Sequence, residues 1–258
     1  MIEFDPYDSL VPVFLRTEIP KRIAQIGTAI FCDIWDQPFL LTAAHVTDDL
    51  KNGTLLVPVK GGLSPIEGYM AHIDLPPDLS RNDDSVDIAY YRLSMEFAHL
   101  LAHNFMPLPQ SRKEIIRSAC ELTVCSASGY PASKSKKNAD GAFSSDIFSF
   151  RGTVASTETY ERLKLSPEQS IVIEFSKKRA LHPGTMDKFP TPSLKGISGG
   201  GIFAWPIGEE VSQDWSLPRL VGIVHTFKEH EGLIIGTTLL PMLAALTLGR
   251  MKNFGDIR

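Results

Sequence analysis

Short apolar or alternating runs recur along this chain of 258 residues, and turn residues bound each of them. Many of their side chains are β-branched or aromatic, which favours strands. Short strands repeated from end to end are typical of an all-β sandwich or a pair of barrels. We therefore predict strands at Leu10–Leu15, Ile23–Ile34, Phe39–Ala44, Leu55–Val59, Ile88–Leu93, Leu122–Ala127, Ile147–Val154, Ile171–Phe175, Gly201–Ala204 and Leu220–Val224.

Helical periodicity is clear in two segments, Met95–His103 and Leu240–Met251. The second segment has apolar residues at helical spacing and basic residues at its end, which is typical of a helix C-terminus. We expect it to be a C-terminal α-helix that docks on the last sheet.

Two polar segments organise the rest of the chain. Pro107–Lys113 carries prolines and lies near the middle, so we place a domain boundary there, between residues 1–108 and 109–258. Ser133–Ser145 is the longest polar stretch without periodicity, and we predict an exposed surface loop for it.

The charge balance argues against two classes of partner. Lys and Arg number 26 and Asp and Glu 30, for a net charge of −4, which gives no electrostatic footprint for nucleic acid. The lysines at 134, 136 and 137 form a patch too short to bind nucleic acid. No apolar stretch reaches the roughly 20 residues of a membrane helix. We expect no nucleic-acid partner and no membrane partner.

The cysteines indicate a reducing compartment. Cys32, Cys120 and Cys125 are odd in number and form no C-x-x-C pair, whereas a secreted domain more often has an even disulfide framework. The first residues show no signal-peptide pattern. We therefore expect a cytoplasmic protein in which Cys120 and Cys125 are buried free thiols.

The first fragment with chemical potential is Leu41–Val46, where an apolar strand ends in small residues and then presents His45. Histidine is the most common general base near neutral pH because its ordinary pKa lies close to that pH. On its own, a histidine at the end of a strand is more often structural.

The second fragment is Asp84–Leu93, in which Asp87 directly precedes an alternating strand. A carboxylate in that place can accept the second ring N–H of a histidine and stabilise its imidazolium form. It can equally bond its own backbone in a turn. Asp83 and Asp84 are close enough to serve instead.

The third fragment is Lys195–Phe203, where Ser198 stands among glycines ahead of an apolar strand. Glycines permit positive φ and a close approach of substrate. They also allow the N–H groups of Gly196 and Ser198 to point together at a developing oxyanion.

Together the fragments resemble the signature blocks of the chymotrypsin-like (trypsin-fold) serine peptidases. Thr42-Ala-Ala-His45, Asp87-Ile-Ala and Gly196-Ile-Ser198-Gly-Gly stand in that family's order, with the histidine and aspartate in the first half of the chain. Leu122–Pro131 looks like the strand that opens the second barrel, and Leu220–Thr226 looks like the strand that lines the substrate cleft. The resemblance covers most of the chain, from about residue 23 to residue 240.

This resemblance implies two six-stranded antiparallel β-barrels with a C-terminal α-helix, and hydrolysis of protein or peptide substrates. It implies that Ser198 attacks the peptide bond, that His45 transfers the proton and that Asp87 orients His45. The amides of Gly196 and Ser198 would bind the oxyanion. It implies no cofactor and no metal.

Several departures from the family pattern affect its regulation. Val46 stands where secreted members have a disulfide cysteine, and Gly201 stands where a proline is common. Ile197 stands where many members have the aspartate that pairs with a freed N-terminus, so we expect no zymogen switch of that kind. The chain looks more like the bacterial stress-protease and glutamyl-endopeptidase branches, without an appended peptide-binding domain.

The expected substrate pocket departs from the trypsin type. Pro192 stands where trypsin-like enzymes have an aspartate, and Phe227 stands where a glycine usually keeps the pocket open. By resemblance to glutamyl endopeptidases, His225 with Ser193 would bind an acidic side chain, with Thr226 on the same wall. We expect a small or acidic residue before the scissile bond, and not lysine or arginine.

Two further functions remain open. A latent or non-catalytic regulatory module would keep the same fold, with its cleft blocked by Phe227, by residues 195–197 or by the loop Ser133–Ser145, and with an activating or inhibitory protein partner. The same residues could also hydrolyse esters.

His99 and His103 have a spacing that can hold zinc, but Leu100 replaces the glutamate of the H-E-x-x-H motif, so we interpret them as helix-surface residues.

Overall fold

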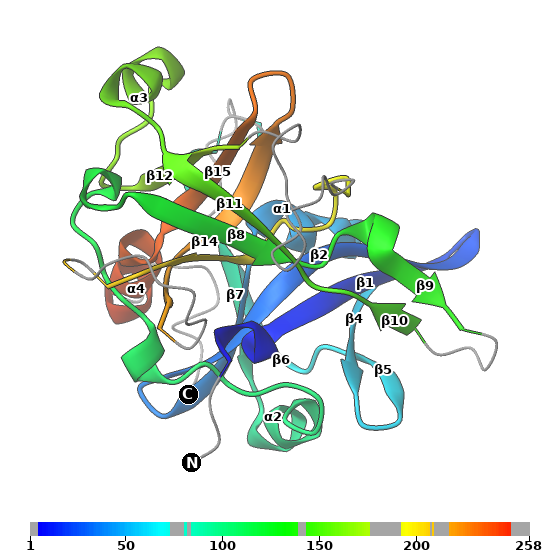
Figure 1. The fold of residues 1–258 in the computed structure, drawn as a ribbon. Coiled ribbons are helices and arrows are strands. Elements are labelled where there is room, and N and C mark those ends of the chain that lie inside the picture. The colour runs from blue at the N-terminus through cyan, green and yellow to red at the C-terminus, as the bar shows by residue number, and fades with distance from the viewer. Residues whose placement is uncertain are drawn as a thin grey trace, which may run out of the picture.

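The computed structural model describes residues 5–72, 80–81, 84–138, 143–175, 192–206, 208 and 217–248. The first half forms one antiparallel sheet of seven strands in the order β5-β4-β1-β2-β3-β7-β6 (Figure 1). Its strands are β1 (Leu10–Glu18), β2 (Lys21–Ile34), β3 (Gln37–Thr42), β4 (Thr54–Val59), β5 (Gly62–Pro65), β6 (Gly68–His72) and β7 (Ala89–Leu93).

The second half forms a closed barrel in the order β11-β12-β15-β14-β13-β8, and a separate hairpin pairs β9 with β10. Several barrel strands are buried along nearly their whole length, which suits their continuous β-branched and aliphatic sequences. The strands are β8 (Val124–Gly129), β9 (Ser135–Lys137), β10 (Phe143–Ser145), β11 (Phe148–Val154), β12 (Ser170–Glu174), β13 (Gly201–Ala204), β14 (Arg219–Lys228) and β15 (Leu233–Thr238).

The four described α-helices are short, and each connects strands or follows the last strand. They are α1 (Ala44–Asp48), α2 (Met95–Leu101), α3 (Thr157–Leu163) and α4 (Leu239–Leu248). The last helix follows β15 directly and contacts β14 and β15, as expected for a helix docked on the last sheet. None of the helices in the described residues is long and apolar enough to cross a membrane.

The expected fold class is confirmed: the chain is mostly β, with a six-stranded barrel, a second curved sheet and a C-terminal helix. In the first half the sheet has seven strands. The expected strand Phe39–Ala44 is wrong at its end, because Ala44 begins α1. The segment Ser133–Ser145 is also not a plain loop: it contains the β9–β10 hairpin, in which Phe143 packs against Phe14 of β1.

Three groups of buried side chains hold the fold together. One group lies inside the barrel. Another is formed by side chains of the first sheet together with those of α1 and α2. The third contains residues of both halves, including Ile30 and Phe39 from the first sheet, Phe203 and Ile223 from the barrel, and Met242 from α4. The two halves therefore share a dry interface rather than a flexible connection.

The connector between the halves is fixed on the first sheet. The N–H of Leu108 donates to the carbonyl of Phe31 (2.8 Å), and the ammonium group of Lys113 donates to the carbonyl of Leu108 (3.0 Å) and to that of Asp33 (2.6 Å). Burial lowers the pKa of Lys113 from its ordinary value, although Cys32 and Asp33 oppose the shift.

Thr28 of β2 is the polar junction between the halves. It is fully buried, and its N–H donates to the carbonyl of Ser198 (2.8 Å). Its hydroxyl donates to the carbonyl of Gly196 (2.9 Å) and accepts from the N–H of Tyr130 (2.9 Å). Its carbonyl accepts from the hydroxyl of Thr42 (2.7 Å). One strand residue thus fixes the serine turn of the second half against the first sheet.

Replacing Thr28 by valine keeps the shape of the side chain and removes its hydroxyl. We expect the free energy of unfolding to fall by about 2–4 kcal/mol, because the Gly196 carbonyl and the Tyr130 N–H lose a partner in a dry site. Urea denaturation measures this, with Thr17→Val as the control, since the Thr17 hydroxyl makes an exposed hydrogen bond. Equal losses in the two variants would contradict the role of Thr28.

Candidate active site

His45 is the second residue of α1, a helix of five residues that begins directly after β3. Ala43 is its N-cap residue and supplies no side-chain hydrogen bond. The N–H of His45 instead donates to Oδ1 of Asp87 (2.9 Å). A carboxylate from another segment therefore replaces the missing cap and satisfies a free N–H of the first turn.

The same carboxylate also binds the His45 ring. Oδ2 of Asp87 lies 2.5 Å from Nδ1 of His45, and the Asp87 side chain is only 4% exposed, against 36% for His45. Burial alone would raise the pKa of Asp87, but its hydrogen bonds with His45 and the nearby histidines together hold the pKa below its ordinary value. An ionised carboxylate fixes the tautomer that leaves Nε2 free to act as a base.

Asp84 and Asp83 are the other carboxylates that the sequence offers as partners of His45. Asp84 accepts a hydrogen bond from the N–H of Val86 (3.0 Å) with one oxygen and binds Arg81 (2.7 Å) with the other. Asp83 lies outside the described residues. Asp87 is thus the carboxylate that the structure brings to His45.

Ser198 stands in a tight turn whose glycines are required by geometry. Gly196 and Gly199 have φ values of +97° and +84°, in the left-handed region that glycine favours. A Cβ atom on Gly199 would lie 2.0 Å from the carbonyl oxygen of Thr28 and 2.2 Å from the hydroxyl of Thr42. Glycine at this position therefore allows the serine turn to contact the first sheet directly.

The N–H groups of this turn differ in whether they have a hydrogen-bond partner among the described residues. The N–H groups of Ile197, Gly199 and Gly200 donate within the protein. Those of Gly196 and Ser198 donate to no partner among the described residues. Two free N–H groups beside a serine hydroxyl are the arrangement that stabilises an oxyanion.

The turn and the histidine helix are neighbours through Gly27 of β2. A Cβ atom on Gly27 would lie 2.8 Å from Cγ2 of Val46 and 3.2 Å from the carbonyl oxygen of Ser198. The Ser198 hydroxyl itself donates to the carbonyl of His225 (3.3 Å). Within the described part of the chain no hydrogen bond joins Ser198 to His45, so the structure brings together His45 and Asp87 and places Ser198 close by with its hydroxyl turned to β14.

His225 occupies an irregular position on β14. The pairing with β15 shifts between Val224 and Thr226, so His225 is the extra residue of a bulge. Its ring is buried, and its Nδ1 lies 2.9 Å from the Thr226 hydroxyl. Nε2 has no hydrogen-bond partner in the described residues. Burial lowers the pKa of His225 from 6.5 to about 4, although Asp87 and Asp84 oppose the shift. The ring is therefore neutral near pH 7.

The other expected pocket residues lie on two segments. Pro192 is buried, and the exposed Ser193 accepts a hydrogen bond from the N–H of Lys195 (3.3 Å). Thr226 and Phe227 are half-buried, and Phe227 packs against the hydrophobic core of the barrel.

Other candidate groups take no part in this site. His99 and His103 are exposed on and just after α2, and no cluster of three or more possible metal ligands occurs in the described ranges. Cys125 is buried as expected, and burial raises its pKa to about 12. Cys120 is exposed, because it lies in a short 3₁₀ turn before β8, and the expectation of a buried thiol is wrong there.

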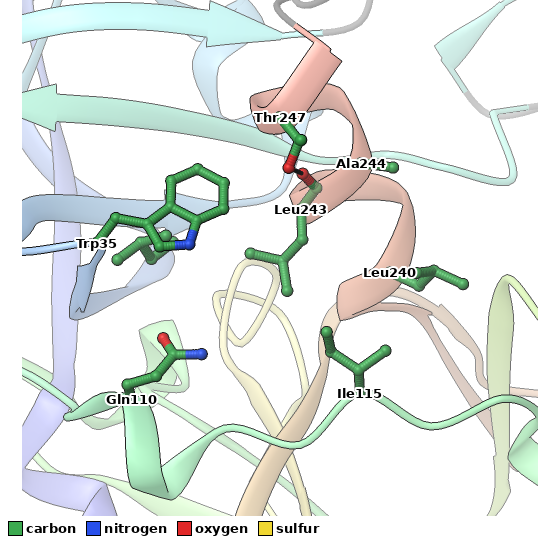
Figure 2. A pocket seen from close by; sticks show the side chains of 8 residues that line it. Trp35, Gln110, Ile115, Leu240, Leu243, Ala244 and Thr247 are labelled. Atoms are coloured by element: carbon green, nitrogen blue, oxygen red, sulfur yellow. Dashed lines mark hydrogen bonds between the residues drawn. The ribbon is translucent and has the colours of Figure 1, made fainter.

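A hollow of about 420 Å³ lies between the β2–β3 turn and α4 (Figure 2). None of the candidate site residues lines it. Its walls are mostly apolar and contain no titratable side chain: Ile34, Trp35, Gln110, Ile115, Leu240, Leu243, Ala244 and Thr247.

Several solved structures have a similar fold. Neuropsin, a serine protease expressed in the limbic system of mouse brain, is 14% identical, with 97% of this chain and 96% of that chain covered and a TM-score of 0.53. A catalytically inactive tobacco etch virus protease complexed with substrate is 13% identical, with 98% and 90% covered and a TM-score of 0.50. The serine protease domain of Sesbania mosaic virus polyprotein is 16% identical, with 92% and 91% covered and a TM-score of 0.49.

No protein-family model matches the sequence, and no curated protein matches it. At the identities above, the structural likeness establishes the fold alone. The chain therefore has the fold of the chymotrypsin-like serine proteases. The expected kinship with the bacterial stress-protease and glutamyl-endopeptidase branches stays a prediction.

The buried His225 predicts a loss of stability in weak acid. Because its folded-state pKa lies below its ordinary value, protonation favours the unfolded chain, so its contribution is fully present above pH 6.5 and is lost as the pH falls toward 4. The expected loss is about 3 kcal/mol. The lowered pKa of Asp87 affects the free energy of unfolding mainly below pH 4, because the ordinary pKa of the group is 3.8.

Urea denaturation at pH 7 and at pH 4 tests this prediction. His225→Gln should reduce the difference between the two pH values, whereas the control His99→Gln, at an exposed position, should preserve it. A difference of equal size in His225→Gln and the wild type would show that His225 is not the group responsible.

Proposed function

We propose that the chain is a serine endopeptidase that hydrolyses peptide bonds through His45, Asp87 and Ser198. The observation that carries the proposal is the hydrogen bond of His45 with the buried Asp87, beside a serine turn in which two N–H groups have no partner among the described residues. The shared fold of the chymotrypsin-like proteases supports the same class of reaction. The proposal includes the division of the chain into residues 1–108 and 109–258, with the site between them.

The proposed reaction begins when the Ser198 hydroxyl turns from the His225 carbonyl to Nε2 of His45. Its oxygen attacks the substrate carbonyl carbon, and the proton passes to Nε2. The resulting imidazolium is stabilised by the Asp87 carboxylate, and the oxyanion is stabilised by the N–H groups of Gly196 and Ser198.

Collapse of this tetrahedral intermediate breaks the C–N bond. His45 returns the proton to the leaving amine, and Ser198 keeps the acyl group as an ester. A water molecule then repeats the same steps on the ester, with His45 again as the base, and releases the carboxylic acid and the free serine. Apart from this water molecule, side chains and backbone amides of the chain supply the groups that these steps use.

Kinetics of the catalytic variants test this proposal. We expect Ser198→Ala to lower kcat on a peptide substrate by about 10⁶-fold and Asp87→Asn by about 10⁴-fold, with the fold intact, because these are the losses measured in other serine proteases. Asp49→Asn is a matched control near α1, since Asp49 binds only Asn52 among the described side chains. A larger loss for Asp84→Asn than for Asp87→Asn would contradict the assignment of the acid.

We further propose that the residue before the scissile bond is small, and that lysine and arginine are excluded. Phe227 lies on β14, the strand that we expect to line the cleft, and no acidic residue stands at 192 or 193 to pair with a basic group. An acidic residue is the second choice. His225 gives little support to binding of an acidic side chain. Its buried ring is neutral near pH 7, and the negative charges of Asp84 and Asp87 act at the same place.

A peptide library that varies this residue tests the preference. Wild-type protein should cleave after alanine and valine, and Phe227→Gly should raise kcat/KM for larger apolar residues by about 10-fold or more, as the pocket deepens. Phe105→Gly is a control for the loss of an aromatic ring in the first half, where Phe105 packs on the sheet core. Efficient cleavage after arginine by the wild type would refute the proposed preference.

One observation favours a second function, that of a latent protease that a partner activates. The Ser198 hydroxyl donates to the His225 carbonyl and makes no hydrogen bond with His45 in the described structure. A protein partner that turns this hydroxyl toward His45 would switch the chain on. High activity of the isolated chain on generic substrates would exclude this second function.

A further inference from the structure

Arg81 lies between the two segments that carry the catalytic pair. Its Nε donates to Oδ2 of Asp48 (3.0 Å) and its Nη2 to Oδ1 of the same residue (3.4 Å). Its Nη1 donates to Oδ2 of Asp84 (2.7 Å). Asp48 is three residues after His45, and Asp84 is three residues before Asp87. One guanidinium therefore joins the histidine helix to the aspartate segment.

These contacts are shielded from water. The side chains of Arg81 and Asp84 are 17% and 7% exposed, and that of Asp48 is 33% exposed. Burial alone would lower the pKa of Arg81, but the hydrogen bonds and charges of the two carboxylates raise it instead. Ion pairs at this depth are screened less by salt than surface pairs, and their geometry is better defined.

The location of these contacts matters because α1 is too short to be rigid by itself. A helix of five residues has little intrinsic stability. The Asp87 carboxylate holds its first turn through His45, and Asp48 is its last residue. Arg81 therefore fixes the end of α1 that Asp87 does not reach, so that the helix has polar anchors at both ends.

Asp84 carries the same restraint into the aspartate segment. Its Oδ1 accepts the N–H of Val86, which fixes the turn that leads into Asp87. The hydroxyl of Thr237 on β15 donates to the carbonyl of Ser85 (3.3 Å) and anchors this turn on the barrel. A shift of Asp84 would thus move the residues that orient the Asp87 carboxylate.

We propose that Arg81 is a positioning residue of the active site: by bridging Asp48 and Asp84 it holds His45 in register with Asp87. The proposal rests on the proposed function only for its catalytic consequence, because the bridge also sets the geometry of the His45–Asp87 hydrogen bond. Lysine cannot replace it fully, because one ammonium lacks the planar fork that binds two carboxylates at once.

Loss of Arg81 leaves two carboxylates facing each other without their shared cation. Asp84 is almost fully buried, so an uncompensated charge there favours a displaced turn. A displacement of about 1 Å in a catalytic group can cost about 10²-fold in rate. We expect that cost to fall on kcat, because Arg81 binds Asp48 and Asp84 and acts on His45 and Asp87 only through them.

The kinetic test compares Arg81→Gln and Arg81→Lys with the wild type on one peptide substrate. We expect kcat to fall about 10²-fold in Arg81→Gln and less in Arg81→Lys, with KM changed by less than about 2-fold. The control is Arg162→Gln, which removes the exposed ion pair between Arg162 of α3 and Glu231 of the β14–β15 turn. Unchanged kcat in folded Arg81→Gln, or an equal loss in the control, would overturn the proposal.

A spectroscopic test does not depend on catalysis. The proton of the short His45–Asp87 hydrogen bond should give a low-field resonance in the wild type, and Arg81→Gln should shift or broaden it. If the wild type cleaves no peptide but the resonance responds to Arg81→Gln, the proposed function fails and the bridge stands. If the wild type is active and the resonance is identical in both proteins, the bridge fails and the function stands.

Asp48→Ala keeps the test decisive if Arg81→Gln does not fold. It removes the more exposed carboxylate and leaves the pair between Arg81 and Asp84 in place. We expect the same change in kcat and in the resonance, at a smaller size. Wild-type values of both in folded Asp48→Ala would overturn the proposal.

Discussion

The geometry of the proposed active site depends on the hydrogen bonds of one buried residue, Thr28. Its N–H, carbonyl and hydroxyl all have partners, and these partners belong to the serine turn, to β3 and to the segment that follows β8. Polar groups at a dry interface are costly unless every one of them is paired, so this junction has one low-energy arrangement. Gly199 completes it, because the turn contacts β2 where no side chain would fit.

Buried carboxylates and their partners position the histidine helix α1 of the proposed site. Asp87 acts as the cap of α1 and as the partner of the His45 ring, so that one buried carboxylate fixes both the backbone and the imidazole. A second carboxylate, Asp84, is neutralised by Arg81 and does not compete for His45. The two aspartates thus have separate tasks, because His45 lies within hydrogen-bond distance of Asp87 and Arg81 lies within hydrogen-bond distance of Asp84. The neutral, buried His225 adds no opposing charge near pH 7.

Local sequence signals predicted β1–β4, β7, β8, β11–β14 and the C-terminal helix, because alternation and turn residues act over a few neighbours, but they did not predict β5, β6, β9, β10 or β15. They failed where contacts distant in sequence decide the structure. Ala44 continues an apolar run, yet it begins a helix because Asp87 caps that helix from another segment. Arg81 stands in a polar stretch with no motif, and only the folded chain brings Asp48 to it. The β9–β10 hairpin likewise depends on a contact with Phe14 of β1.

Labelling with a fluorophosphonate, followed by mass mapping of the adduct, tests whether Ser198 is the nucleophile, because this reagent reacts with a serine that has both a general base and an oxyanion site. We expect one rapid adduct on Ser198 in the wild type. We expect no adduct in Ser198→Ala, and slow labelling in His45→Ala. A well-folded wild-type chain that forms no adduct, or forms it on another serine, would contradict the assignment of Ser198 as the nucleophile.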